Sequence, residues 1–131
     1  MTKPGKIIEP PHCNIRDHER QTAKVIANAG LTVEFISASN KDLSKSPDIM
    51  IDGRRWEMKS PKTNKMSQVE KNLRRASKQA ENIIIDSQRI KHIPDKKIQD
   101  FLKERLKIRK SIKRIVFVNK RRKIVDITSS Y

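Results

Sequence analysis

The sequence has 131 residues, of which 34% are hydrophobic and 4% aromatic, and its 31 Lys and Arg against 15 Asp and Glu give a net charge of +16. This length fits one domain with a small aliphatic core. The single cysteine excludes an intramolecular disulfide scaffold, and no apolar run is long enough to span a membrane, so we expect no membrane insertion by this domain. The basic excess predicts an acidic partner, most often nucleic acid.

The first part of the chain predicts an irregular lead-in over residues 1–14, rich in Pro and Gly, followed by a single domain over residues 15–131. Residues 15–29 predict a helix with Asp17 as its N-cap and Gly30 as its stop. Glu19 lies one turn before Ala23 on nearly the same face of this helix. A carboxylate there is either a first-turn residue favoured by the helix dipole or a metal ligand, and its position in the chain leaves both open.

Residues 31–36 predict a strand, and the polar residues 37–46 predict a loop that could form one wall of a site. Glu34 on this strand competes with Glu19 as a candidate carboxylate and ranks second to it, because an exposed strand position is the commoner explanation for a Glu there.

Residues 47–59, PDIMIDGRRWEMK, predict a hairpin with strands at 48–52 and 55–59 around Asp52-Gly53. With a two-residue loop, side chains that face each other share one side of the hairpin. One side then carries three charged residues, namely Asp48, Glu57 and Lys59. The other side carries four apolar residues, namely Ile49, Ile51, Trp56 and Met58. A three-residue loop would break this arrangement.

The charged side of the hairpin suggests a particular chemistry. Two carboxylates a few ångströms apart repel each other unless a cation lies between them, and Mg²⁺ suits carboxylate oxygens plus water. A neighbouring lysine can orient an attacking water or stabilise developing charge. Asp48, Glu57 and Lys59 are therefore candidates for metal-assisted phosphodiester hydrolysis. The alternative is that Asp48 begins the strand while Glu57 and Lys59 form a solvated sheet edge.

The second half of the chain continues with alternating elements. We expect a loop at 60–65, a helix at 66–81 with a Ser67–Glu70 capping box, a buried strand at 82–86 reached by a crossover, a helix at 95–110, and a hairpin of strands 114–118 and 123–128. His92 has no partner signal and is interpreted as structural. The order of elements predicts an α/β fold with a mixed central sheet flanked by helices.

The basic residues concentrate late in the chain. Residues 103–123 hold 11 basic side chains and one acid, which predicts a surface that follows a nucleic-acid backbone. A solvated face, or a docking surface for an acidic protein, would explain the same charges. The candidate nucleic-acid-binding residues are Lys62, Lys65, Lys78, Lys107, Arg109, Lys110, Lys113, Arg121 and Arg122.

Several sequence blocks resemble known proteins. Pro47-Asp48 followed by Glu57-Met58-Lys59 resembles the signature of PD-(D/E)xK nucleases. Together with His18-Glu19 and the later KQAENIIID, the run DIMIDGRRWEMKSPK resembles the tRNase-type toxin domain at the C-terminus of contact-dependent growth inhibition (CdiA) effectors, over roughly residues 15–120.

The resemblance implies a restriction-endonuclease-like core and a third carboxylate, Glu19, on the first helix. Gln79 would orient the metal-bound water or the scissile phosphate, and Lys78 is a weaker candidate for that role. The resemblance further implies a tRNA substrate, delivery from a cell-surface effector into the cytoplasm of a target bacterium, and a cognate immunity protein, which by charge should be acidic.

Three hypotheses from different classes follow from the sequence. The first is a Mg²⁺-dependent tRNase toxin, the second a DNA endonuclease or resolvase of the same fold, and the third a basic nucleic-acid-binding domain without catalysis. Substrate panels separate the first two, and the third predicts that Asp48→Ala and Lys59→Ala leave all activity unchanged.

Overall fold

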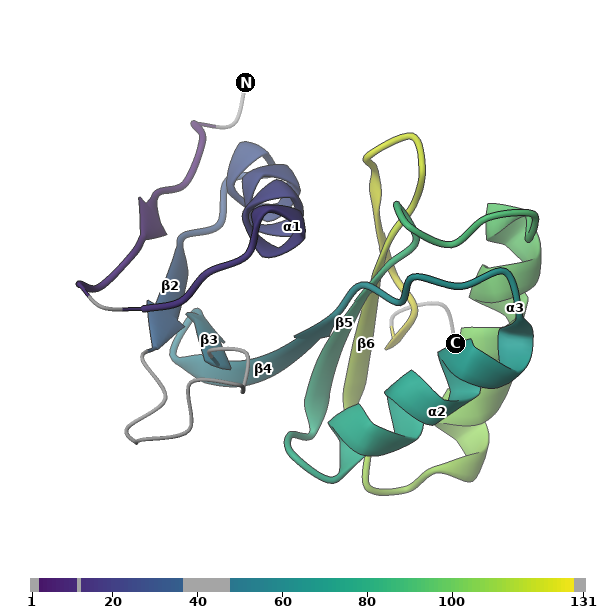
Figure 1. The fold of residues 1–131 in the computed structure, drawn as a ribbon. Coiled ribbons are helices and arrows are strands. Elements are labelled where there is room, and N and C mark those ends of the chain that lie inside the picture. Colours follow the sequence, from purple (N-terminus) through teal and green to yellow (C-terminus); the bar gives the residue numbers. More distant parts are fainter. Residues whose placement is uncertain (1–2, 12, 37–47, 129–131) are drawn as a thin grey trace. The chain divides into compact units, whose positions relative to one another are not determined.

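The computed structural model describes residues 3–11, 13–36 and 48–128, with only the backbone of Asp48 (Figure 1). The elements are β1 (Ile7–Ile8), α1 (Asp17–Asn28), β2 (Val33–Ile36), β3 (Asp48–Ile51), β4 (Arg54–Lys59), α2 (Met66–Ser77), β5 (Asn82–Asp86), α3 (Asp95–Ile108), β6 (Arg114–Val118) and β7 (Ile124–Asp126). The predicted loop at 37–46 and Pro47 lie outside the described residues. None of the helices in the described part of the chain has the length and apolarity that a membrane crossing requires.

The chain divides into two compact units, Met1–Trp56 and Glu57–Tyr131, and the boundary falls within β4. This division does not decide whether the two units fold as one domain, so the single domain over residues 15–131 stays a prediction. Following the strand pairings along the chain gives the order β1-β2-β3-β4-β5-β6-β7 in a mixed sheet. The predicted α/β fold with a mixed sheet is confirmed.

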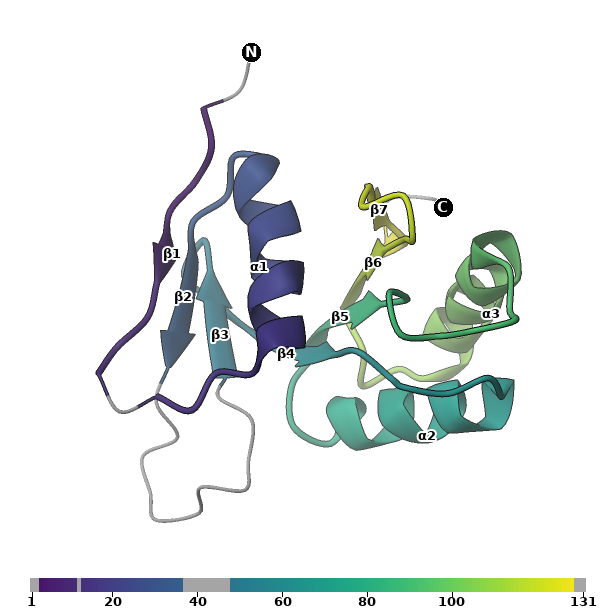
Figure 2. The same ribbon diagram turned by 45° about the horizontal axis from the view of Figure 1, so that its top comes forward.

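In the first unit, α1 lies along β2 and β3 (Figure 2). Strand β1 pairs in parallel with β2, and β2 pairs in antiparallel with β3. The apolar stripe of α1, with Ala23 and Ile26, is buried, as are the inward-facing residues of the strands: Val33, Phe35, Ile49, Ile51 and Trp56. The alternation of buried and exposed residues along β2 is that of a strand with one covered face.

Strand β1 lies within the lead-in predicted to be irregular. Its two residues are held by a hydrogen bond from the Val33 N–H to the Lys6 carbonyl (2.8 Å), and the Gly5 N–H donates to the Ala27 carbonyl (2.7 Å). A Cβ at Gly5 would lie 2.0 Å from the Leu31 carbonyl oxygen, so only glycine allows this close approach. The prediction missed β1 because these partners lie far along the chain.

The hairpin of β3 and β4 has the predicted two-residue loop. Ile49 pairs with Trp56, Met50 with Arg55 and Ile51 with Arg54, the register of a loop centred on Asp52-Gly53. Both loop residues have positive φ, 52° at Asp52 and 73° at Gly53, as a type I′ turn requires. All four residues of the predicted apolar side, Ile49, Ile51, Trp56 and Met58, are buried.

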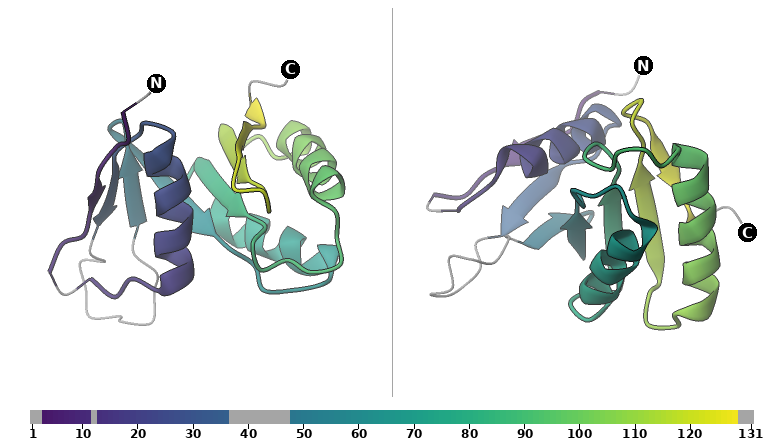
Figure 3. Two further views of the ribbon diagram at one scale, coloured as in Figure 1. Left: turned by 90° about the horizontal axis from the view of Figure 1, so that it is seen from above. Right: turned by 45° about the vertical axis from the view of Figure 1, so that its right-hand side comes forward.

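In the second unit, β4 is parallel to β5, and β5 is parallel to β6. Strand β7 pairs with β6 in the antiparallel direction. Helices α2 and α3 pack on one face of β5 and β6 (Figures 1 and 3). Their apolar stripes, including Leu73 and Leu102, enclose a core with alternate strand residues: Ile83, Ile85, Ile115 and Phe117. The predicted crossover and the C-terminal hairpin are both confirmed.

The helix ends differ from the predictions. Arg16, rather than Asp17, is the N-cap of α1, and the Arg16 N–H donates to Glu19 Oε1 (2.8 Å). The Ser67–Glu70 capping box is wrong, because α2 begins at Met66 with Lys65 as its N-cap and no side-chain capping bond. Glu70 instead forms ion pairs with Arg105 and Arg109 around α3. Two cations at close range stabilise this carboxylate more than one backbone N–H does.

Helices α2 and α3 also end earlier than predicted. Helix α2 ends at Ser77 rather than 81, and α3 ends at Ile108 rather than 110. Strand β5 begins at Asn82, and the residues just before it form the turn that connects α2 to this strand. The helix therefore ends before the helical pattern of the sequence does. Gln79 is consequently an exposed residue of the turn after α2, not a helix residue.

Candidate active site

Glu57 and Lys59 lie on one face of β4, two residues apart. They stand beside Ile83 and Ile85 of β5 in the parallel register, which places all four on the side of the sheet that α2 and α3 cover. Glu57 is only 3% exposed, and Lys59 is half-buried. The alternative interpretation of Glu57 as a solvated sheet-edge residue is therefore wrong.

The burial of Glu57 has an electrostatic consequence. Removing a carboxylate from water is costly unless charge or hydrogen bonds compensate it, and a cation is the strongest compensation. In a surrounding of low dielectric, charges near Glu57 interact more strongly than they would at the surface. A buried Glu followed by a half-buried Lys on the same face therefore provides an acidic and a basic group at the end of one strand.

Glu19 and Asp48, the other predicted carboxylates, belong to the first unit, whereas Glu57 belongs to the second. Glu19 is 4% exposed and accepts the Arg16 N–H, so it caps its own helix. Asp48 begins β3, and its side chain is outside the description. Glu34, the competing carboxylate, is exposed on β2.

A divalent ion would find suitable donors among these residues, because carboxylate oxygens are the ligands that Mg²⁺ prefers. Within residues 3–11, 13–36 and 49–128, no group of three or more His, Cys, Asp or Glu side chains is arranged to hold a metal ion. The donor chemistry thus fits Mg²⁺, and a shell built from Asp48, Glu57 and Glu19 stays a prediction.

Cys13 precedes the start of α1 by four residues. Burial, followed by the negative charges of Glu19 and Glu9, raises the pKa of the Cys13 thiol above its ordinary value. The thiol therefore remains protonated at neutral pH, where it is a poor nucleophile.

A polar network follows directly after β4, at the carboxyl ends of the parallel strands. Asp86, the last residue of β5, is fully buried and accepts two hydrogen bonds from the Arg122 guanidinium (2.8 and 3.0 Å). The Gln88 amide donates to Asp86 Oδ2 (3.2 Å) and to the Ser60 hydroxyl (3.5 Å). The network thus begins one residue beyond Lys59.

Asp86 and Gln88 were not among the residues predicted from the sequence. One available signal was the rule that ligands of parallel sheets bind outside the carboxyl ends of the strands, applied to the DSQR run after the apolar strand. Arg122, one of the predicted nucleic-acid-binding residues, forms an ion pair with Asp86.

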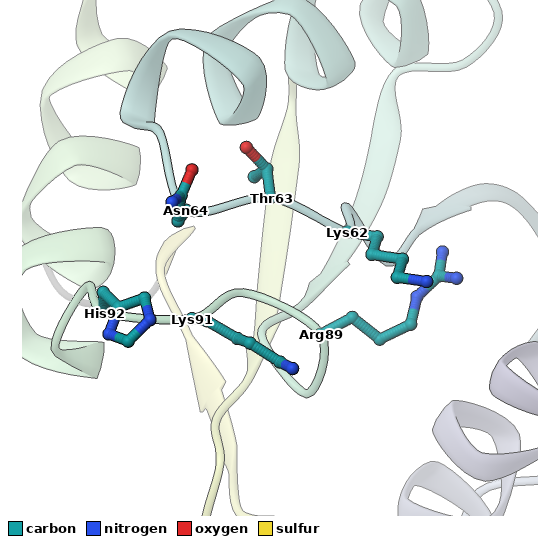
Figure 4. A pocket seen from close by; sticks show the side chains of 6 residues that line it. All are labelled: Lys62, Thr63, Asn64, Arg89, Lys91 and His92. Atoms are coloured by element: carbon teal, nitrogen blue, oxygen red, sulfur yellow. The ribbon is translucent and has the colours of Figure 1, made fainter.

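A pocket of about 280 Å³ opens beside this network (Figure 4). The residues that line it are Lys62, Thr63, Asn64, Arg89, Lys91 and His92. The Arg89 guanidinium donates to the Ser60 carbonyl through Nε (3.0 Å) and Nη2, which links the pocket wall to the end of β4. His92, interpreted from the sequence as structural, lies at this pocket.

The predicted nucleic-acid-binding residues fall into two groups in the structure. One group is exposed and comprises Lys62, Lys65, Lys78, Lys107, Lys110, Lys113 and Arg121. Within this group, Lys113 forms an ion pair with Glu81 (3.3 Å). The other group, Arg109 and Arg122, is half-buried and paired with Glu70 and Asp86. The first group supplies the outward charge, and the second stabilises the fold.

The fold and these side chains define a small, strongly basic α/β domain with a buried Glu and a Lys at the end of one strand. Residues 45–124 match the family described as the contact-dependent growth inhibition CdiA C-terminal domain. The match covers more than half of the sequence, and the chain belongs to this family. It includes the β3–β4 hairpin, the polar network and the pocket, but not Glu19.

A similar solved structure is described as the CdiA-CT/CdiI toxin and immunity complex from Burkholderia pseudomallei. The likeness covers 93% of this chain and 95% of that chain, with a TM-score of 0.61 and 19% sequence identity. At this identity the likeness concerns the fold. A comparison with curated proteins returned no match.

Proposed function

We propose that this domain is the toxin of a contact-dependent growth inhibition effector and that it is a nuclease of the PD-(D/E)xK type, with RNA, and tRNA first, as its substrate. Membership of the CdiA C-terminal domain family supports the biological setting. The observation that carries the chemistry is the pair on β4, a buried Glu57 with Lys59 two residues later on the same face.

In the proposed reaction, Glu57 and Asp48 bind a divalent ion such as Mg²⁺, and Glu19 completes its ligands. Asp48 is included because of the hairpin register. Ile49 pairs with Trp56, so continuing the register by one residue sets Asp48 opposite Glu57. When bound, the metal lowers the pKa of its water and offsets the charge that builds on the phosphoryl oxygens.

Lys59 contributes the positive charge of the chain itself. Its ammonium group orients the attacking water or stabilises the charge that develops on the phosphate in the transition state. The half-buried position of Lys59 strengthens that interaction relative to a fully exposed lysine. A role for Gln79 in orienting the water rests on the resemblance alone, since this residue is exposed beyond α2.

Recognition of the substrate would depend on its backbone. Aromatic residues are only 4% of the sequence, too few for a platform on which bases stack. The second unit has 22 Lys and Arg against eight Asp and Glu, which favours contacts to many phosphates of a folded RNA.

The same charge bears on the partner in the producing cell. The similar structure from Burkholderia pseudomallei is described as a toxin with an immunity protein. By analogy, we expect a cognate immunity protein for this domain, with an acidic surface that complements its net charge of +16. In this setting the domain is carried by a cell-surface effector and acts in the cytoplasm of the target bacterium.

The test is an incubation of the purified domain with total bacterial tRNA and, separately, with plasmid DNA, each with Mg²⁺ and with EDTA. Glu57→Gln and Lys59→Met would be compared with Glu104→Gln, a control that removes one exposed carboxylate of α3. We expect discrete tRNA fragments from the wild-type protein and the control, and a loss of rate of about 10²-fold or more for the two β4 variants.

Other outcomes would redirect the proposal. Metal-dependent cleavage of plasmid DNA alone would retain the chemistry and identify a DNA endonuclease. Equal rates for all variants would remove Glu57 and Lys59 from the mechanism. If no nucleic acid is cut, even after addition of bacterial cell extract, the domain is a binding module.

A further inference from the structure

The pocket of Figure 4 is built by two loops that follow neighbouring parallel strands. The loop after β4 supplies Lys62 to Asn64, and the loop after β5 supplies Arg89, Lys91 and His92. The Lys91 N–H donates to the Thr63 carbonyl (2.9 Å), and the Thr63 N–H donates to the Arg89 carbonyl (3.4 Å). These backbone bonds, which make a parallel bridge between Thr63 and Ile90, fix the two loops to each other.

The charge of the pocket is entirely positive. Its six lining residues include Lys62, Arg89 and Lys91 and no carboxylate. Lys62 and Lys91 are exposed, and neither forms an ion pair within the part of the chain that the structure describes. Lys62 and Lys91 carry the same charge at one pocket and repel each other, so an anion bound here would relieve that repulsion.

The neutral groups of the pocket are also suited to an anion. The side chains of Thr63, Asn64 and His92 all have hydrogen-bond donors, and α2 begins two residues after Asn64 with the positive end of its dipole. His92 has a φ of 65°, a left-handed conformation that costs a non-glycine residue about 1 kcal/mol or more. Such local strain is frequent at binding sites, where the surrounding structure maintains it.

The location of the pocket ties it to β4. Lys62 follows Lys59 by three residues, which corresponds to at most about 10 Å of extended chain. Arg89 is fixed to the carbonyl of Ser60, the residue directly after Lys59. The volume of about 280 Å³ is small for a metabolite site and large enough for one phosphate with part of its sugar.

We infer that this pocket binds a backbone phosphate of the nucleic-acid substrate, next to the phosphate that is cut. The inference rests on the proposed nuclease function. Phosphate contacts fix the register of a nucleic acid on a protein without reading its sequence. Lys62, Arg89 and Lys91 would thereby set which bond is presented to Lys59.

The test compares two double variants that remove the same charge. Lys62→Gln/Lys91→Gln alters the pocket, whereas Lys24→Gln/Lys97→Gln removes two exposed lysines elsewhere. Binding of a short 2′-O-methyl RNA oligonucleotide would be measured by fluorescence anisotropy in EDTA over a range of salt concentrations. Circular dichroism and thermal unfolding would verify that both variants are folded.

For the pocket variant we expect affinity about tenfold weaker than wild type. The salt dependence of its binding, log K against log[salt], should be shallower by about 0.7 for each phosphate that the variant no longer neutralises. The control should retain the wild-type slope. Titration of the wild-type protein with inorganic phosphate should shift the NMR signals of Thr63, Lys91 and His92 before those of the control lysines.

Equal slopes for the two double variants would overturn the inference. If the pocket variant loses binding to polyglutamate but not to the RNA, the pocket is a docking site for an acidic protein instead. Cleavage of tRNA in Mg²⁺, measured alongside, separates the two proposals. A wild-type domain that cuts no nucleic acid yet shows the difference in slope refutes the nuclease function and retains the phosphate pocket.

Discussion

The two units of the chain differ in charge and in the size of their cores. Met1–Trp56 has nine Lys and Arg against seven Asp and Glu, a net charge of +2, whereas Glu57–Tyr131 has 22 against eight, a net charge of +14. Among the residues that the structure describes, the first unit has one helix on a short sheet, and the second has two helices over a core of 14 buried residues. Under the proposed function, this difference in charge favours the second unit as the part that binds nucleic acid.

The largest effect expected from this comparison concerns the two cores. Phe117 in the second unit and Phe35 in the first are both fully buried. Each Phe→Ala change should lower the free energy of unfolding by about 3–5 kcal/mol, because it leaves a cavity. Hydrogen exchange should show loosening only in the unit that bears the change. Loosening of both units by either change would mean that they unfold as one cooperative body.

Removing an ion pair should lower the free energy of unfolding more in the second unit than in the first. Arg122 pairs with Asp86, whose side chain is 0% exposed, whereas Arg20 pairs with Glu9, whose side chain is 37% exposed. Arg122→Met removes the cation that pairs with this buried carboxylate and should cost about 3 kcal/mol in urea unfolding. Arg20→Met should change stability far less, because water can solvate the exposed Glu9 carboxylate once the arginine is removed. Equal losses of unfolding free energy in the two variants would contradict this expectation.

Glu19 offers a test of function against capping in the first unit. Glu19→Ala should cost about 1 kcal/mol of stability, since it removes the acceptor for the Arg16 N–H. Glu19→Gln keeps an acceptor oxygen and should leave stability nearly unchanged. If Glu19 is a metal ligand, tRNA cleavage falls in both variants. A Gln variant with full cleavage activity would leave capping as its role.

The smallest effect concerns Asp95 at the start of α3. Burial alone raises its pKa, but hydrogen bonds from the Ser87 hydroxyl and from the backbone and side chain of Lys120 bring the pKa below the ordinary value of 3.8. A depressed pKa means that the ionised form stabilises the fold above that value and that this stability is lost as the pH falls through the folded-state pKa. Asp95→Asn should therefore lower stability at neutral pH by about 1 kcal/mol.

The measurement for Asp95 is urea unfolding of both proteins from neutral pH down to about pH 3. The difference between wild type and Asp95→Asn should shrink at the acid end, because the wild-type carboxyl becomes neutral as well. Asp126, which accepts the Thr128 N–H at an exposed position, supplies the control Asp126→Asn. A constant difference over this range would contradict the linkage.

Local patterns in the sequence were enough for most of the elements. The Asp52-Gly53 loop, the alternation of Ile49, Ile51, Trp56 and Met58, and the apolar strand 82–86 follow from backbone geometry and side-chain periodicity. These depend on residues close together in the chain, so no tertiary information was needed. The resemblance to CdiA effectors was likewise present in the order of short motifs, and the match of residues 45–124 to the CdiA C-terminal domain family confirms it, whereas the PD-(D/E)xK resemblance stays a prediction.

Other features were decided by residues far apart in the sequence. Strand β1 depends on Val33, and Glu70 is bound by arginines that follow it by 35 and 39 residues rather than capping its own helix. Asp86 is neutralised by Arg122, 36 residues later. The pocket exists only because parallel pairing of β4 and β5 brings Lys62 near Arg89 and Lys91.

The sequence by itself thus determined the hairpin, the α/β order and the positions of the charged candidates, because turn chemistry and periodicity act over a few residues. The tertiary structure alone decided which charges stabilise the fold and which remain at the surface. The physical reason is that a buried carboxylate takes its cation from whatever element packs beside it, and packing is a property of the whole unit.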